Sequence, residues 1–152
     1  KRNRRRTNGM TEHSPIIVQW GDTVGTIEDD PRLRVLLVDD HAMVRYGLTQ
    51  LFAAEADIRV VGQAADGAEG VELTRRLKPD VVLMDVAMPG MNGIEAADRI
   101  KKEMPHVRVV ALSMHNMDDV RRRMLAAGAD EYVRKTSSPE RLLAAVRGPE
   151  RR

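Results

Sequence analysis

Short runs of consecutive apolar residues recur along the chain from residue 32 onward, separated by longer stretches in which apolar positions repeat every three or four residues. The runs are rich in Val and Leu and lie at 33–39, 58–64, 80–85, 107–113 and 131–135. The stretches with helical periodicity lie at 41–54, 66–77, 92–104, 117–128 and 138–147. The pattern therefore predicts five β-strands that alternate with five α-helices.

Residue types at the ends of the periodic stretches indicate where the helices begin and end. Lys78 precedes Pro79, and a residue before proline is disfavoured in the helical conformation, so the second helix should end there. Gly128 closes the fourth stretch as a glycine cap. Ser138 and Pro139 open the last stretch as an N-cap and a first helical residue. These signals support the five helices that the periodicity predicts.

The predicted strands are continuously apolar rather than alternating between apolar and polar positions. Such strands are buried on both faces, which indicates a parallel sheet with helices on each side. Right-handed crossover connections leave few ways to order the strands. We therefore predict that residues 32–147 form a doubly wound α/β domain, with a five-stranded parallel sheet in the flavodoxin-like order 2-1-3-4-5.

Residues 1–31 show no sustained periodicity, so we expect a mostly disordered N-terminal extension whose one apolar patch, 15–20, could form a short strand. Five of the 25 basic residues lie in its first six positions, which leaves 20 basic against 23 acidic residues in the rest of the chain. A nucleic-acid-binding arm is one interpretation of this cluster, and a solvated end is the one we favour. Met10 is a plausible natural start, so residues 1–9 could precede the native protein.

Composition excludes several classes of protein. The chain of 152 residues has no cysteine, which excludes disulfides and thiolate metal sites and fits a reducing cytosol. No apolar run approaches the roughly 20 residues of a membrane span. The basic N-terminus is not followed by the apolar stretch of a signal peptide. We therefore expect a cytoplasmic protein without membrane association.

Polar residues stand at the ends of four predicted strands. Asp39 and Asp40 end the first, Asp85 the third, Ser113 the fourth and Lys135 the fifth. The carboxyl ends of parallel strands meet at one edge of a sheet, and ligands bind there where the strand order reverses. Each of these residues alone is common in loops. Their joint placement predicts that the five side chains converge on one site.

Three clustered carboxylates repel one another unless a cation neutralises them. Oxygen ligands without His or Cys favour a hard divalent ion such as Mg²⁺. Lys135 adds a positive charge and Ser113 a hydrogen-bond donor, so the pocket suits a dianion. One of the carboxylates can then act as a nucleophile toward phosphorus.

Four segments resemble the motifs of a known family: VLLVDDH, DVVLMDVAMPGMNGIE, VVALSMH and GADEYVRKTSSPERLLAAV. They resemble the response-regulator receiver domain of two-component signalling, with a CheY-like fold. The residues of these motifs are most similar to those of the NarL/FixJ class, in which a receiver precedes a LuxR-type helix-turn-helix. The resemblance covers about residues 32–147.

The resemblance implies a set of roles for the strand-end residues. Asp85 would accept a phosphoryl group from a sensor histidine kinase. Mg²⁺ would be held by Asp39, Asp40, Asp85 and the backbone carbonyl of Ala87. Ser113 and Lys135 would bind the phosphoryl oxygens. Such a domain is not an enzyme beyond its own phosphorylation and dephosphorylation.

The resemblance also implies a switch. Tyr132 matches the switch aromatic, so Ser113 and Tyr132 should move on phosphorylation and reshape the surface of the fourth helix, the fifth strand and the fifth helix. A phosphorylation-dependent homodimer would be one consequence. Residues 148–152 indicate the start of a linker and leave no room for a helix-turn-helix. We therefore expect a fragment of a transcriptional regulator that contacts DNA only through an absent C-terminal domain.

Other functions are open on the same fold. A stand-alone receiver acting through protein–protein contacts is one alternative, and a degenerate receiver is another. A metal-dependent phosphohydrolase would need an acid two residues after the nucleophile, where this chain has Ala87. A flavin- or nucleotide-binding domain would need a Gly/Ser/Thr-rich loop after the first strand, where this chain has Asp-Asp-His.

Overall fold

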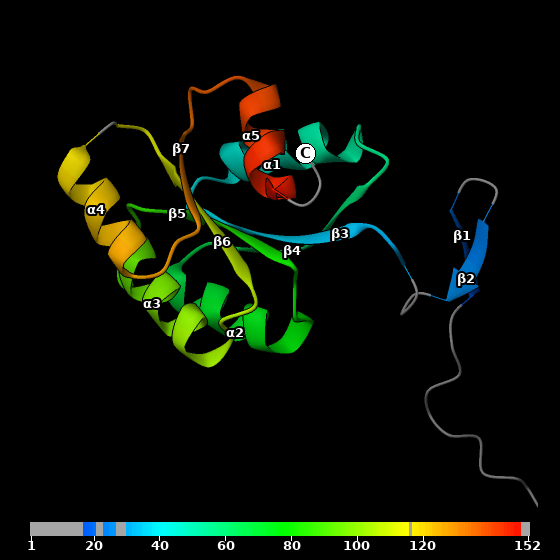
Figure 1. Cartoon of the computed structure of the whole chain (residues 1–152), viewed down its shortest axis with the longest axis horizontal. Coiled ribbons are helices and arrows are strands. Elements are labelled where there is room, and N and C mark those ends of the chain that lie inside the picture. The colour runs from blue at the N-terminus through cyan, green and yellow to red at the C-terminus, as the bar shows by residue number, and fades with distance from the viewer. Residues whose placement is uncertain (1–16, 21–22, 27–29, 116, 150–152) are drawn as a thin grey trace, which may run out of the picture. The chain divides into compact units, whose positions relative to one another are not determined.

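The computed structural model describes residues 17–20, 23–26, 30–115 and 117–149 (Figure 1). The chain divides into two compact units, Lys1–Pro31 and Arg32–Arg152. In the first unit, β1 (Ile17–Trp20) pairs antiparallel with β2 (Thr23–Thr26). The described part of the apolar patch, residues 17–20, thus forms a strand, and a second strand lies at 23–26, where the sequence predicted disorder. The basic cluster and the rest of the expected disorder lie outside the described residues.

The second unit contains one five-stranded sheet. All its pairings are parallel, in the order β4-β3-β5-β6-β7. When the five strands of this sheet are numbered from β3 onward, this is the predicted order 2-1-3-4-5. Its strands are β3 (Leu33–Val38), β4 (Ile58–Ala64), β5 (Val81–Asp85), β6 (Arg108–Ser113) and β7 (Glu131–Arg134). Each differs from its predicted range by one residue at most at either end.

Five helices connect and follow these strands. They are α1 (Ala42–Ala53), α2 (Gly67–Leu77), α3 (Gly93–Glu103), α4 (Asp118–Ala126) and α5 (Pro139–Arg147). The predicted caps are confirmed: Lys78 leaves the helical conformation with φ +49°, and the Ser138 side chain accepts from Arg141 N. None of the helices in the described ranges is long and apolar enough to cross a membrane.

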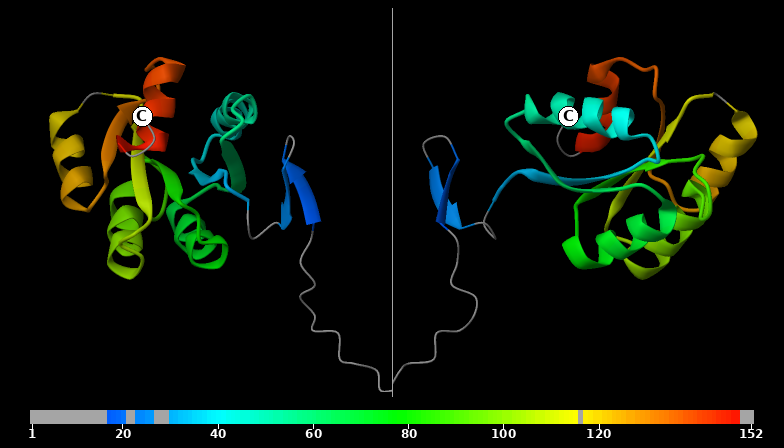
Figure 2. Two further views of the ribbon diagram at one scale, coloured as in Figure 1. Left: turned by 45° about the vertical axis from the view of Figure 1, so that its right-hand side comes forward. Right: turned by 180° about the vertical axis from the view of Figure 1, so that it is seen from behind.

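The helices cover both faces of the sheet (Figures 1 and 2). On one face, Leu36, Val38 and Met84 pack in a cluster with residues of α2, α3 and α4. On the other, Leu37 and Leu83 pack with residues of α1 and α5. Neighbouring residues of one strand therefore belong to opposite cores, which is why β3, β5 and β6 carry runs of consecutive apolar residues. This burial anchors the carboxyl ends of the strands as a rigid edge.

Candidate functional site

The carboxyl edge of the sheet brings the predicted residues together. Asp39 directly follows β3, Asp85 ends β5, and Lys135 directly follows β7. The Lys135 Nζ atom lies 2.6 Å from Asp39 Oδ2 and 3.3 Å from Asp85 Oδ1. Residues 96 positions apart in the sequence thus meet because β3, β5 and β7 are parallel and end at the same edge of the sheet.

These charged groups are removed from water. Asp39 and Asp85 are 1% and 3% exposed. Burial and the nearby charge of Asp39 together raise the pKa of Asp85 to about 6, although Lys135 opposes both effects. Burial alone would lower the pKa of Lys135, but its ion pairs with the two carboxylates outweigh that effect and raise it. The site is therefore a buried cluster of acids that one lysine neutralises incompletely.

The donor set fits a divalent cation. Asp39, Asp40, His41 and Asp85 each present one ligand atom, and these four atoms all lie within 4.8 Å of one another. Asp85 Oδ2 is buried and has no hydrogen-bond partner in the described part of the chain. The Ala87 N–H donates to Asp85 Oδ1 at 3.3 Å, which places that residue beside the carboxylate. An ion held by these groups would satisfy oxygens that the protein itself leaves without partners.

His41 was missed as a member of this cluster by the sequence analysis, which treated the donor set as oxygen alone. Its Nδ1 atom lies 3.2 Å from Asp39 Oδ1 and 3.0 Å from Asp40 Oδ1. The signal in the sequence was its position, directly after the two aspartates.

Ser113 and Tyr132 share one backbone acceptor. The Ser113 hydroxyl donates to His115 O at 2.7 Å, and its oxygen accepts from His115 N at 3.2 Å. The Tyr132 hydroxyl donates to the same carbonyl oxygen at 3.0 Å. Both hydroxyls are thus bound to the loop after β6, and Ser113 is directed to that loop rather than to Asp85.

Residues 35–147 match the model of the response regulator receiver domain. The chain belongs to this family. The receiver domain is 44% identical over 115 residues to the transcriptional regulatory protein LiaR of Bacillus subtilis strain 168, a match that covers 76% of this chain and 54% of LiaR. It is 42% identical over 115 residues to the response regulator protein VraR of Staphylococcus aureus strain NCTC 8325, covering 76% of this chain and 55% of VraR. The chain thus spans about half the length of the curated relatives it matches.

Solved structures agree with this fold. A LuxR-family two-component response regulator from Aurantimonas sp. SI85-9A1 is 38% identical, with a TM-score of 0.71, over 74% of this chain and 80% of that one. The signal receiver domain of the putative response regulator NarL from Mycobacterium tuberculosis is 31% identical, with a TM-score of 0.72, over 77% and 98%. The predicted family and its NarL/FixJ-like class are therefore confirmed.

An apolar pocket of about 230 Å³ opens beside the phosphoacceptor candidate of the receiver domain. Asp85, Ser113 and Lys135 contribute to its lining, together with the apolar side chains of Met114 and Met117. Both methionines are more than half exposed. Met114 thus lines the pocket beside Asp85 with a side chain that also reaches solvent.

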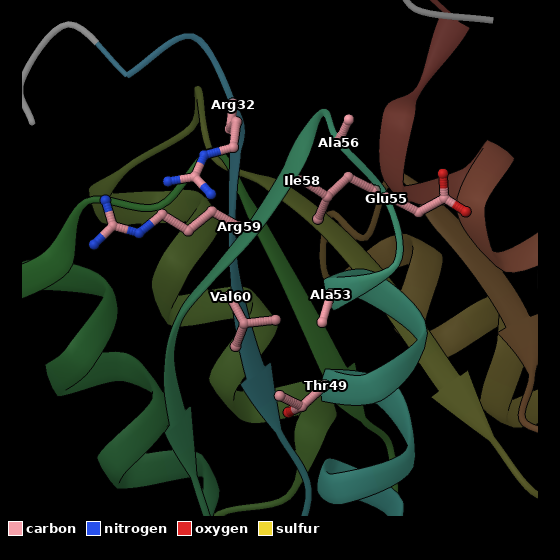
Figure 3. Close-up of a pocket in the computed structure, with 8 residues that line it drawn as sticks. All are labelled: Arg32, Thr49, Ala53, Glu55, Ala56, Ile58, Arg59 and Val60. Atoms are coloured by element: carbon pink, nitrogen blue, oxygen red, sulfur yellow. The ribbon is translucent and has the colours of Figure 1, made fainter. Parts of the chain in front are cut away.

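A larger pocket of about 420 Å³ lies elsewhere, between α1 and the first residues of β4 (Figure 3). Thr49 and Ala53 line it from α1, and Ile58 and Val60 from β4 (Figure 3). These β4 residues belong to the amino-terminal part of the strand, whereas the acid cluster lies at the carboxyl ends. This pocket therefore takes no part in the site.

The loop after β5 depends on Gly93. A Cβ atom at Gly93 would lie 2.1 Å from Asp85 O and 2.9 Å from Val86 Cα, both of which are backbone atoms. We expect Gly93→Ala to lower the free energy of unfolding by about 2 kcal/mol or more, because the backbone at Asp85 and Val86 must shift. Urea unfolding followed by circular dichroism would measure this change.

Gly47→Ala is the matched control for that substitution. Gly47 lies within α1, and a Cβ atom there would have no neighbour within 4 Å. Alanine is the better helix former, so this variant should be more stable by about 0.5–1 kcal/mol. Equal effects of the two substitutions would contradict the role of Gly93.

Proposed function

We propose that this receiver domain accepts a phosphoryl group on Asp85 from the phosphohistidine of a sensor histidine kinase. An Asp85 carboxylate oxygen attacks phosphorus, the N–P bond of the donor breaks, and the released imidazole takes up a proton. The main support for the proposal is the environment of Asp85. It is a buried carboxylate whose Oδ1 contacts Lys135, while its Oδ2 has no hydrogen-bond partner among the described residues.

The neighbouring residues have complementary roles in this proposal. Asp39, Asp40, Asp85 and the backbone carbonyl of Ala87 would hold Mg²⁺, which when bound supplies positive charge against that of the transferred group. Lys135 already lies within 3.3 Å of Asp85 Oδ1 and would bind a phosphoryl oxygen. The domain is itself the acceptor of the phosphoryl group, and hydrolysis of phosphorylated Asp85 is the only further reaction that this function involves.

Phosphorylation would also redirect Ser113. The phosphorylated aspartate carries close to two negative charges where the free carboxylate carries one. Its oxygens would compete for the Ser113 hydroxyl, which now donates to His115 O. That carbonyl would then accept from Tyr132 alone. We infer that this exchange couples Asp85 to the surface formed by α4, β7 and α5, and that a phosphorylation-dependent homodimer could use that surface.

The output that this receiver controls is inferred from its relatives. LiaR is a transcriptional regulatory protein about twice as long as the matched region, so this receiver would control a DNA-binding domain joined through the linker that begins near 148–152. The described residues would not contact DNA themselves. A receiver acting through protein–protein contacts alone is the second candidate, and a cytoplasmic location remains a prediction for both.

Acetyl phosphate tests the phosphoacceptor role without the kinase. We expect the purified chain to gain the mass of one phosphoryl group in the presence of Mg²⁺, measured on the intact protein. Asp85→Asn should abolish the gain, and so should removal of divalent cations with EDTA.

Asp119→Asn is the matched control, because Asp119 is an exposed aspartate at the start of α4. It should be labelled as the wild type is. Labelling that persists in Asp85→Asn would contradict the assignment of the phosphoacceptor. A folded wild-type protein that takes no label from either acetyl phosphate or phosphorylated kinases would favour the contact-only alternative.

A further inference from the structure

We propose that His41 makes this cation site bifunctional, so that it binds a first-row transition ion such as Zn²⁺ or Cu²⁺ through an imidazole nitrogen in place of Mg²⁺ bound through oxygens. The inference rests on the proposed Mg²⁺ site and adds a ligand class to it. It assigns His41 a role that the proposed phosphoryl transfer does not require.

Histidine is an unusual residue at the start of a helix, where His41 stands. It is the N-cap residue of α1, a position where Ser, Thr, Asp or Asn normally bonds to the first turn. The His41 side chain makes no capping hydrogen bond, and no acidic residue stands in that first turn. Its ring lies against the carboxylates instead, while the side chain remains 64% exposed. Helix stability therefore does not account for the orientation of this ring.

The distances suit a common ion. Two neighbouring ligand atoms bound to one ion at about 2.1 Å are about 3.0–3.4 Å apart in octahedral or tetrahedral geometry. The His41 Nδ1 atom lies 3.0 Å from Asp40 Oδ1 and 3.2 Å from Asp39 Oδ1. A single N–H can only be shared between these two oxygens, as a weaker bifurcated bond, whereas a metal ion can contact all three atoms.

Asp85 is the second, independent indication of a ligand. Its side chain is 95% buried, and its Oδ2 atom has no hydrogen-bond partner within the described ranges. All four ligand atoms fall within 4.8 Å of one another, close to the roughly 4.2 Å that separates opposite ligands of one ion. A shift of a few tenths of an ångström would thus complete a site of one nitrogen and three oxygens.

The chemistry of the ligands then decides which ion binds with the higher affinity. A hard ion such as Mg²⁺ gains little from imidazole and keeps its waters, whereas Zn²⁺ and Cu²⁺ bind imidazole strongly and stand high in the order of divalent affinities. An ion held by His41 would occupy the place of Mg²⁺ beside Asp85. Zn²⁺ would therefore compete with Mg²⁺ for the receiver, and His41 would set the strength of that competition.

Isothermal titration calorimetry of the full chain with Zn²⁺ and, separately, with Mg²⁺ tests the inference. We expect His41→Gln to weaken Zn²⁺ binding by at least roughly tenfold and to change Mg²⁺ binding by less than about threefold. His115→Gln is the matched control, because His115 lines the adjacent pocket but does not belong to the four-residue cluster. It should bind both ions as the wild type does.

Electron paramagnetic resonance with one equivalent of Cu²⁺ identifies the ligand directly. Imidazole nitrogen coupling should be present in the wild type and in His115→Gln, and absent in His41→Gln. Zn²⁺ affinity unchanged in His41→Gln, or nitrogen coupling retained there, would overturn the inference. Absence of Mg²⁺ binding to the wild type would instead contradict the proposed function, and the Zn²⁺ difference would still decide the role of His41.

Discussion

Replacing Lys135 with Met is expected to lower the free energy of unfolding by about 3–5 kcal/mol at pH 7.5 in the absence of divalent ions. The Lys135 side chain is 8% exposed and lies against Asp39 and Asp85, whose side chains are 2% and 5% exposed. Its removal leaves two buried carboxylates without a cation, which is one of the costlier changes a protein core can undergo. Methionine keeps the length and most of the volume of lysine, so the loss of charge dominates the result.

Lys102→Met provides the matched control for Lys135→Met. Lys102 forms an ion pair with Asp98 one helical turn away at 2.9 Å, but its side chain is 76% exposed. Exposed pairs of this kind contribute only about 0.3–0.5 kcal/mol. Urea unfolding of both variants with EDTA present measures the contrast. Similar losses in the two variants would show that Lys135 does not neutralise the buried acids.

Asp85→Asn is expected to stabilise the metal-free domain, most strongly above pH 7. The pKa of Asp85 rises from 3.8 to about 6 in the folded protein, so folding disfavours its charged form. Each pKa unit corresponds to about 1.4 kcal/mol, so the charge costs roughly 3 kcal/mol at pH 7.5. Asparagine has no such charge. The stability difference should be present in full above pH 7 and decline as the pH falls through 6 toward 4.

Unfolding curves of wild type and Asp85→Asn between pH 4.5 and 8 measure this difference. Asp119→Asn, at an exposed position, should follow the wild type at every pH. Saturating Mg²⁺ should narrow the gap at pH 7.5, because an ion that binds the folded acids stabilises the wild type, with its additional carboxylate, more than the variant. A gap that stays constant with pH would contradict the charge-based explanation.

Both substitutions concern the same conflict between stability and function. The fold gathers acids at the carboxyl edge of the sheet, where one lysine compensates for only part of their charge. The cost is consistent with a site that requires a cation and a nucleophilic carboxylate. The free energy of unfolding is therefore expected to increase when Asp85 is neutralised and to decrease when Lys135 is neutralised.

The sequence by itself determined the elements and their order. Helical periodicity, continuous apolar strands, and the caps at Lys78, Gly128 and Ser138 depend on residues a few positions apart, so they can be seen in the sequence. The parallel sheet and its order then followed from general rules of connection. The same rules predicted that Asp39, Asp85 and Lys135 would share one edge.

The tertiary structure alone decided how the side chains of that edge face one another. Ser113 and Tyr132 reach the same carbonyl because β6 and β7 pair with Ser113 opposite Arg134. The contact of His41 Nδ1 with two carboxylates depends on the direction in which the chain runs from β3 into α1. Residue 93 must be glycine because α3 begins very close to Asp85 O. Such contacts depend on strand register, helix approach and side-chain rotamers, which packing over the whole domain sets. Local sequence patterns carry no information on distances between atoms that only the folded chain brings together.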